Sequence, residues 1–167
     1  MNCFIIAAMT LDGFIAKSKD HCSTEWNSDA DKAWFRQKTK EAGVIVMGTN
    51  TFNTIGKPLP GRLTIVYSRE PKPTENPEQL RYTKLSPPEL LKQLQDEGYS
   101  NVAICGGSTI YTLFMQAGVV NNMYITLEPK LFGKGIGLFN DDITQTVELQ
   151  ETTPLSPQTL LLQYGVR

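Results

Sequence analysis

Hydroxyl and guanidinium side chains gather in one polar segment near the middle of the chain. Two apolar runs rich in β-branched residues, Val44–Met47 and Thr64–Tyr67, flank this segment and predict buried strands. Glycines and prolines interrupt the polar segment, and the second run ends at Ser68 and Arg69. Because α/β sheets bind ligands where their strands end, we predict a binding site at this edge of a sheet.

A second candidate element joins a short apolar run, Val102–Cys105, to a predicted helix, Thr109–Ala117, through Gly106–Gly107. Adjacent glycines let the backbone approach a pyrophosphate, and the unpaired N–H groups of a helix start attract anions. Taken alone, the glycine pair is typical of an ordinary turn between a strand and a helix, because GGSTIY matches neither the dinucleotide-binding fingerprint nor the P-loop motif. Together with Ser68–Arg69, which suits a further phosphate, it indicates a dinucleotide with an extra phosphate, for which NADPH is the natural candidate.

A carboxylate among large apolar rings is the third candidate. Ser28 begins a predicted helix that ends at Gly43, and on it Asp31 and Phe35 share a face because they are four residues apart. Such a carboxylate can accept paired hydrogen bonds from an amino-substituted heterocycle, and burial would raise its pKa. The alternative is a capping role, in which Asp31 reaches back to a backbone N–H at Ser28. The residues alone leave both interpretations open.

Two polar residues elsewhere could complete such a site. Thr126 lies within an apolar run, Met123–Leu127, that predicts a buried strand. Arg62 follows a Pro-Gly turn and could hold a ligand carboxylate in a bidentate pair, or equally be a solvated arginine at a strand end. The only histidine, His21, lies in a polar loop, Lys17–Glu25, and we leave it out of the site because it has no evident orienting partner.

The elements that must position these residues fit one α/β domain. The chain has 167 residues, of which 40% are hydrophobic, enough for one continuous core. Further strands are predicted at Asn2–Ala8 and Arg81–Lys84, a helix follows Ser86, and Val147–Thr152 with Thr159–Tyr164 predicts a closing hairpin.

Composition narrows the possible partners and location. Sixteen basic against seventeen acidic residues give no electrostatic reason to expect nucleic acid or an anionic membrane as a partner. The apolar N-terminus lacks a basic leader, and no apolar stretch is long enough to span a bilayer. Three widely spaced cysteines favour free thiols in a reducing compartment. We therefore expect a cytoplasmic protein. Separately from the composition, we expect a monomer or a weak homodimer.

Four segments, WNSDADKAWF, MGTNTFNTIGKPLPGR, VYSR and ICGGSTIYTLF, occur in an order and spacing that resembles the dihydrofolate reductase family. The resemblance implies a single domain over residues 1–167 with a dihydrofolate reductase-like three-layer α/β fold. Its mixed, mostly parallel sheet would have about eight strands, an antiparallel C-terminal hairpin and helices on both faces. It also implies reduction of 7,8-dihydrofolate to 5,6,7,8-tetrahydrofolate, with hydride transfer from NADPH to C6 and protonation of N5 by water.

By position, the resemblance assigns Asp31 to the pterin ring, Thr126 to a hydrogen-bond link with that acid and Arg62 to the substrate's glutamate carboxylate. Trp26 would support the site. The implied catalytic set is Asp31, Trp26 and Thr126, with no metal ligand. The implied substrate-binding set is Ile6, Ala7, Ala8, Asp31, Lys32, Phe35, Thr54, Ile55, Leu59, Arg62, Cys105 and Thr126. The implied cofactor-binding set is Ala8, Ile15, Gly48, Thr49, Asn50, Thr51, Tyr67, Ser68, Arg69, Cys105, Gly106, Gly107, Ser108, Thr109, Ile110 and Tyr111. The resemblance also implies a helix starting near Gly48 and a cis peptide at Gly106–Gly107.

Some positions depart from the family's pattern and support other interpretations. Thr49 stands where the family often has Arg or Lys, and Asp29 stands where a proline is common, so a second carboxylate near Asp31 could perturb its titration. Two segments, TLDGFIA and LFGKGIGLF, resemble the riboflavin-pathway reductase domain, whose NADPH-dependent substrate would be a pyrimidine ribosyl phosphate or a related pterin. A third possibility is a binding protein that has kept the nucleotide pocket and lost catalysis, because fold alone does not fix function.

Overall fold

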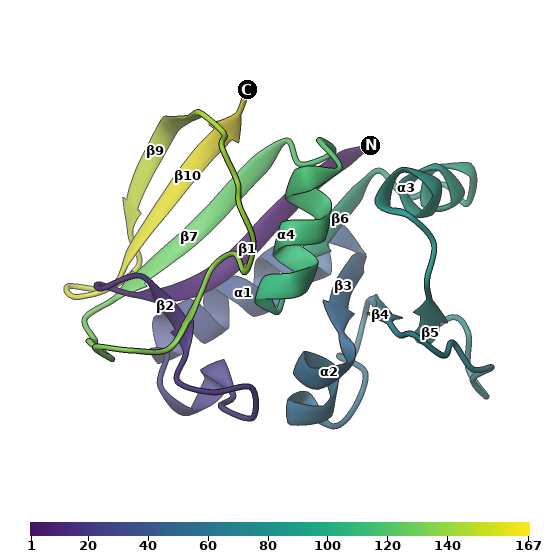
Figure 1. Cartoon of the computed structure of the whole chain (residues 1–167), viewed down its shortest axis with the longest axis horizontal. Helices are drawn as coiled ribbons and strands as arrows, with labels where there is room; N and C mark the ends of the chain where they lie inside the picture. Colours follow the sequence, from purple (N-terminus) through teal and green to yellow (C-terminus); the bar gives the residue numbers. More distant parts are fainter.

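An eight-stranded sheet with the order β5-β4-β3-β6-β1-β7-β10-β9 forms the centre of the computed structural model, which describes residues 1–167 (Figure 1). Neighbouring strands run parallel from β5 to β7, and the last two pairings, of β10 with β7 and with β9, are antiparallel. The strands are β1 (Asn2–Thr10), β3 (Val44–Gly48), β4 (Leu63–Tyr67), β5 (Leu80–Thr83), β6 (Asn101–Ile104), β7 (Asn122–Glu128), β9 (Val147–Pro154) and β10 (Leu160–Val166). The predicted mixed, mostly parallel sheet with a C-terminal hairpin is confirmed.

Helices cover both faces of this sheet, as the resemblance implied. The helices are α1 (Asp29–Ala42), α2 (Thr49–Ile55), α3 (Pro87–Asp96) and α4 (Ser108–Gln116). Side chains alternate across β1, so Phe4 and Ile6 pack in the cluster under α1 and α2, whereas Cys3 and Ile5 pack in the cluster under α3 and α4. Figure 1 shows α4 in front of the sheet and α1 behind it.

The predicted ends of α1 are confirmed, and each has a local cause. At the start, the Ser28 hydroxyl accepts a hydrogen bond from the Asp31 amide at 3.2 Å. At the end, Gly43 has φ 76°, a left-handed conformation that residues with a Cβ rarely adopt. The Gly43 carbonyl then accepts from Leu63 N–H at 2.9 Å, which ties the turn after the helix to β4. The C-terminal end of α1 is thereby held against the sheet.

The polar segment between β3 and β4 is not entirely a loop, which corrects the interpretation from its residues. It contains the seven-residue helix α2, whose start at Thr49 agrees with the resemblance. The helix is rich in Thr and Asn, which are weak helix formers, and it is too short for a clear apolar period, so composition alone favoured a loop. Three shorter elements were also not predicted, the paired strands β2 (Phe14–Ala16) and β8 (Ile136–Gly137) and the 3-10 turn η1 (Ser23–Glu25).

We predict that Gly43→Ala lowers the free energy of unfolding by about 1 kcal/mol or more, because a Cβ is strained at positive φ. Space is not the reason, since a Cβ at Gly43 would meet only the Tyr99 ring at 3.8 Å. Gly137→Ala is the matched control, because Gly137 has no positive φ and its Cβ would lie 3.6 Å from the nearest atom. Urea unfolding of both variants tests this, and equal losses of stability would contradict it.

Candidate active site

A cavity of about 1530 Å³ lies where β1, β3, β4 and β6 end. Every residue predicted to bind substrate or cofactor lines it, except Thr126. Trp26 lies outside as well, on a separate cavity of about 460 Å³ beside the start of α1. The structure therefore brings together residues that are far apart in sequence, at the edge where the ends of the apolar runs predicted a site.

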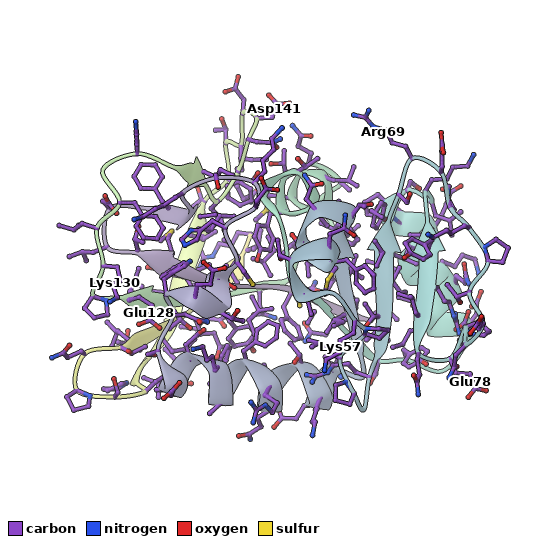
Figure 2. The ribbon with its side chains drawn as sticks, turned by 90° about the horizontal axis from the view of Figure 1, so that it is seen from below. Lys57, Arg69, Glu78, Glu128, Lys130 and Asp141 are labelled. Atoms are coloured by element: carbon purple, nitrogen blue, oxygen red, sulfur yellow. The ribbon has the colours of Figure 1, made fainter.

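The predicted cofactor-binding residues surround two helix starts on this cavity. Neither Gly48, before α2, nor Gly107, before α4, offers a capping side chain, so the first N–H groups of both helices lack side-chain acceptors. The Thr49 hydroxyl donates to the Tyr67 carbonyl at 2.9 Å, which links α2 to the end of β4. The Arg69 side chain is exposed, takes no part in an ion pair and extends from the rim of the molecule (Figure 2). These groups can bind phosphates at separate points along one ligand.

Glycines allow the two helix starts to lie this close together. A Cβ at Gly48 would lie 3.2 Å from Ile110, and a Cβ at Gly106, where φ is 111°, would lie 3.1 Å from the Tyr111 hydroxyl. The implied cis peptide at Gly106–Gly107 is confirmed. The Tyr111 hydroxyl donates to the Ile6 carbonyl of β1 at 2.8 Å, and burial raises the pKa of Tyr111 well above its ordinary value. Tyr111 is therefore a neutral donor that attaches α4 to the central strand.

The Asp31 carboxylate is not used to cap α1. Its side chain is buried, with 4% of the residue exposed, and it accepts a hydrogen bond from the Asn27 amide. The Ser28 N–H, which a capping box would give to Asp31, donates instead to Glu128 of β7 at 2.9 Å. The capping alternative is thus wrong for the carboxylate, although the Asp31 amide does bond to Ser28.

Burial is the main cause that raises the pKa of Asp31 above its ordinary value. The Thr126 hydroxyl, the Asn27 amide and Lys32 oppose this shift, whereas the charge of Glu128 adds to it. The Thr126 hydroxyl influences Asp31 by proximity, but its geometry falls short of a formed hydrogen bond and it has no other partner. The implied link between Thr126 and Asp31 is therefore a juxtaposition in this structure, and the hydrogen bond itself stays a prediction.

The second carboxylate near Asp31 is not the one suggested by the sequence. Asp29 is fully exposed and pairs with Lys32 at 3.7 Å. Glu128, only 2% exposed, is the carboxylate whose charge acts on Asp31. Sequence spacing pointed to Asp29 because it lies on the same helix, whereas Glu128 comes from a strand about a hundred residues away.

Arg62 is a buried guanidinium without an acidic partner. Only 8% of the residue is exposed, and one nitrogen donates to the Arg36 carbonyl at 3.1 Å and to the Thr39 hydroxyl. Its Nε has no partner, no ion pair involves Arg62, and burial lowers the pKa of Arg62. The alternative of a solvated arginine is therefore wrong. A buried cation on a cavity wall suits a ligand anion.

The cavity wall also includes residues that were not predicted, among them His21 and Arg36. His21, which we left out of the site, lines the cavity and is oriented, because its Nδ1 accepts from the Lys17 amide at 3.0 Å and its ring lies 5.6 Å from the Phe132 ring. Arg36 also lines the cavity. A sequence signal existed for Arg36, since it lies four residues after Lys32 on the same helix face. No local signal indicated the contact of His21 with Phe132, which lies in a distant part of the chain.

No helix has the length and apolar composition needed to cross a bilayer, and all three cysteines are free thiols. No group of three or more His, Cys, Asp and Glu side chains is arranged to hold a metal ion.

Comparison with known proteins identifies related sequences. The family model described as dihydrofolate reductase matches residues 2–133. A dihydrofolate reductase from Buchnera aphidicola is 34% identical over 127 residues, which cover 75% of this chain and 70% of that protein. A dihydrofolate reductase from Haemophilus influenzae is 46% identical over 70 residues, which cover 42% of this chain and 41% of that protein. The residues that the family model matches include most of those that line the cavity.

Solved structures with this fold include riboflavin-pathway proteins. A putative riboflavin biosynthesis protein from Shewanella sp. PV-4 has a TM-score of 0.78 at 20% identity and covers 100% of this chain and 99% of that one. A diaminohydroxyphosphoribosylaminopyrimidine deaminase/5-amino-6-(5-phosphoribosylamino)uracil reductase from Thermotoga maritima also has a TM-score of 0.78, at 16% identity, and covers 99% of this chain and 56% of that one. At these identities the likeness shows the fold alone.

We predict that Asp31→Asn stabilises the ligand-free protein near neutral pH. Because burial raises the folded pKa of Asp31 above the ordinary 3.8, the folded state binds more protons between these two values, so wild-type stability falls as pH rises through that window. An amide has no such dependence. The difference in free energy of unfolding between Asp31→Asn and the wild type, measured with urea, should therefore become smaller as the pH falls toward 3.8. A difference that is constant with pH would contradict a raised pKa for Asp31.

Proposed function

Because this chain belongs to the dihydrofolate reductase family, we propose that it reduces 7,8-dihydrofolate to 5,6,7,8-tetrahydrofolate with NADPH as the hydride donor. The observation that carries the proposal is one cavity with a buried carboxylate, Asp31, and a buried unpaired guanidinium, Arg62, on its wall. Dihydrofolate has complementary groups, an amino-substituted pterin ring at one end and a glutamate carboxylate at the other. Each buried charge would thereby gain a partner on binding.

The residues on the cofactor side suit NADPH. The uncapped starts of α2 and α4 offer backbone N–H groups to the pyrophosphate, and exposed Arg69 with Ser68 would hold the further phosphate of the adenosine. Thr49 would contribute little to phosphate binding, because its hydroxyl already donates to the Tyr67 carbonyl. When bound, NADPH supplies the hydride, and the chain's own residues align the two rings and exclude bulk water.

Asp31 is the titratable group that we assign to the reaction. Its carboxylate would accept hydrogen bonds from the amino group and ring N–H of the pterin, while Phe35 and Ile55 would pack against the substrate rings. The buried negative charge would favour protonation of the pterin at N5, with the proton supplied by water. Because burial raises the pKa of Asp31, its protonation adds a pH dependence to the step.

A riboflavin-pathway type of reductase is the second candidate. Arg36 lies beside Arg62 on the cavity wall, and two neighbouring guanidinium groups suit the phosphate of a pyrimidine ribosyl phosphate as well as a carboxylate. Lys32 adds a further cation to the wall. The two candidates use the same cofactor, so the substrate distinguishes them.

The first experiment follows NADPH oxidation with dihydrofolate and, separately, with the aminouracil ribosyl phosphate. We expect turnover of dihydrofolate only. Asp31→Asn should lower the hydride-transfer rate near neutral pH and leave NADPH affinity nearly unchanged, because Asp31 lies on the substrate side. Turnover of the ribosyl phosphate alone would replace the first proposal by the second, and equal losses of rate and NADPH affinity in the variant would indicate misfolding.

We predict that Arg62→Leu raises the KM for dihydrofolate by roughly 10- to 100-fold, the range expected for losing hydrogen bonds to a charged group. The KM for a pterin without the glutamate tail should change little. Arg81→Leu is the matched control, because Arg81 pairs with Glu97 at 2.7 Å outside the cavity. Steady-state kinetics with both substrates test this. An equal effect of Arg62→Leu on the tailless pterin would show that Arg62 does not bind the tail.

A further inference from the structure

Glu128 is a second buried carboxylate that the proposed reaction does not use. It is the last residue of β7, only 2% exposed, and no lysine or arginine pairs with it. It accepts hydrogen bonds from the Ser28 amide at 2.9 Å, the Ser28 hydroxyl at 2.8 Å and the Thr159 hydroxyl at 3.3 Å. A buried carboxylate without a cation is costly, so its retention calls for a role.

The contacts of Glu128 determine how α1 begins. A capping box would have an acid on the helix itself accept the Ser28 N–H, and Asp31 has the correct spacing for that role. Instead, Glu128 of β7 accepts the hydrogen bond of the Ser28 N–H. The Ser28 hydroxyl also donates to Glu128, and the same hydroxyl accepts a hydrogen bond from the Asp31 amide. Hydrogen bonds thus connect Glu128 through Ser28 to the backbone of Asp31.

The two carboxylates lie on either side of the helix start. Asp31 lines the large cavity, Glu128 lines the separate cavity of about 460 Å³, and Asn27 lines both. Figure 2 places Glu128 beside the start of α1, close to Lys130. No hydrogen bond joins Glu128 to the Asp31 side chain. Any effect of one carboxylate on the other therefore acts through Ser28 or through space.

We propose that Glu128 is a positioning residue for Asp31: it holds the first turn of α1 through Ser28, leaves the Asp31 carboxylate facing the cavity, and acts on that carboxylate with its own charge. This inference rests on the proposed function only in assigning Asp31 to the substrate. The hydrogen bonds of Glu128 supply the orientation, and its unpaired charge supplies the electrostatic effect.

The charges around Asp31 agree with this role. Burial raises the pKa of Asp31, and the charge of Glu128 from β7 raises it further, whereas Lys32 on α1 lowers it. From α4, Tyr111 faces Asp31 as a neutral phenol whose own pKa is raised in part by that carboxylate. Asp29 is exposed and paired with Lys32, and the Lys130 side chain is exposed at the small cavity. Glu128 is therefore the buried anion that acts on Asp31.

Two variants separate the effect of charge from that of shape. Glu128→Gln keeps an oxygen that can accept from Ser28 and removes the charge, so the pH profile of hydride transfer should move to lower pH while the KM for dihydrofolate stays near the wild-type value. Glu128→Leu removes the acceptor as well, so Asp31 can turn back to the Ser28 N–H. The KM for dihydrofolate should then rise several-fold with NADPH affinity unchanged. Asp29→Asn is the matched control and should leave the profile in place.

A ¹³C NMR titration of the Asp31 carboxyl in the ligand-free protein gives a readout that needs no turnover. A lower Asp31 pKa in Glu128→Gln than in the wild type, with no shift in Asp29→Asn, supports the proposal even if dihydrofolate is not reduced, in which case only the proposed function fails. An unchanged Asp31 titration in Glu128→Gln overturns the electrostatic part. An unchanged KM for dihydrofolate in a folded Glu128→Leu protein overturns the positioning part.

Discussion

The structure depends on the burial of β1 between two parallel neighbours. β1 pairs with β6 on one side and with β7 on the other, and its central side chains are buried on both faces. This pairing sets Ala8 opposite Thr126 and, through β6, places the Gly106–Gly107 turn beside the end of β3. Because parallel strands end at the same edge, the residues that follow them meet there whatever their separation in sequence. The cavity is a consequence of this arrangement.

Small residues explain why this edge is open. Ala7 and Ala8 lie near the end of β1, Gly48 is the last residue of β3, and Gly106 and Gly107 come shortly after β6, so small residues border the space between the strand ends and the helices. The Gly48 amide donates to the Gly106 carbonyl at 2.8 Å, a contact that extends the pairing of β3 with β6 beyond the last residue of β6. The backbone is therefore held firmly at the point where it faces a ligand. This preorganisation reduces the entropy lost on binding.

What could be predicted from the sequence was local or was implied by the family pattern. The ends of α1 follow from Ser28 and Gly43, and the buried strands follow from their apolar runs, because these signals act within a few residues. Helix α2 was missed from composition because tertiary packing, rather than helix propensity, maintains seven weakly helical residues. The role of Glu128 could not be predicted, since it depends on a pairing about a hundred residues apart. The choice between the two interpretations of Asp31 depends on which acid accepts the hydrogen bond of the Ser28 amide, and that acid is Glu128.

The buried charges of the site are kept apart. Asp31 and Glu128 lie at the start of α1, whereas Arg62 bonds to Arg36 and Thr39 further along the same helix, and no ion pair joins either acid to this guanidinium. An ion pair of Asp31 with Arg62 would relieve the cost of burying both charges, and it would also leave neither charge available to a ligand in the cavity. The folded chain therefore gives up stability that a charge-neutral core would have. A ligand with a hydrogen-bond donor face at one end and an anion at the other would recover that stability on binding, so the separation of Asp31 from Arg62 would favour a ligand that carries both.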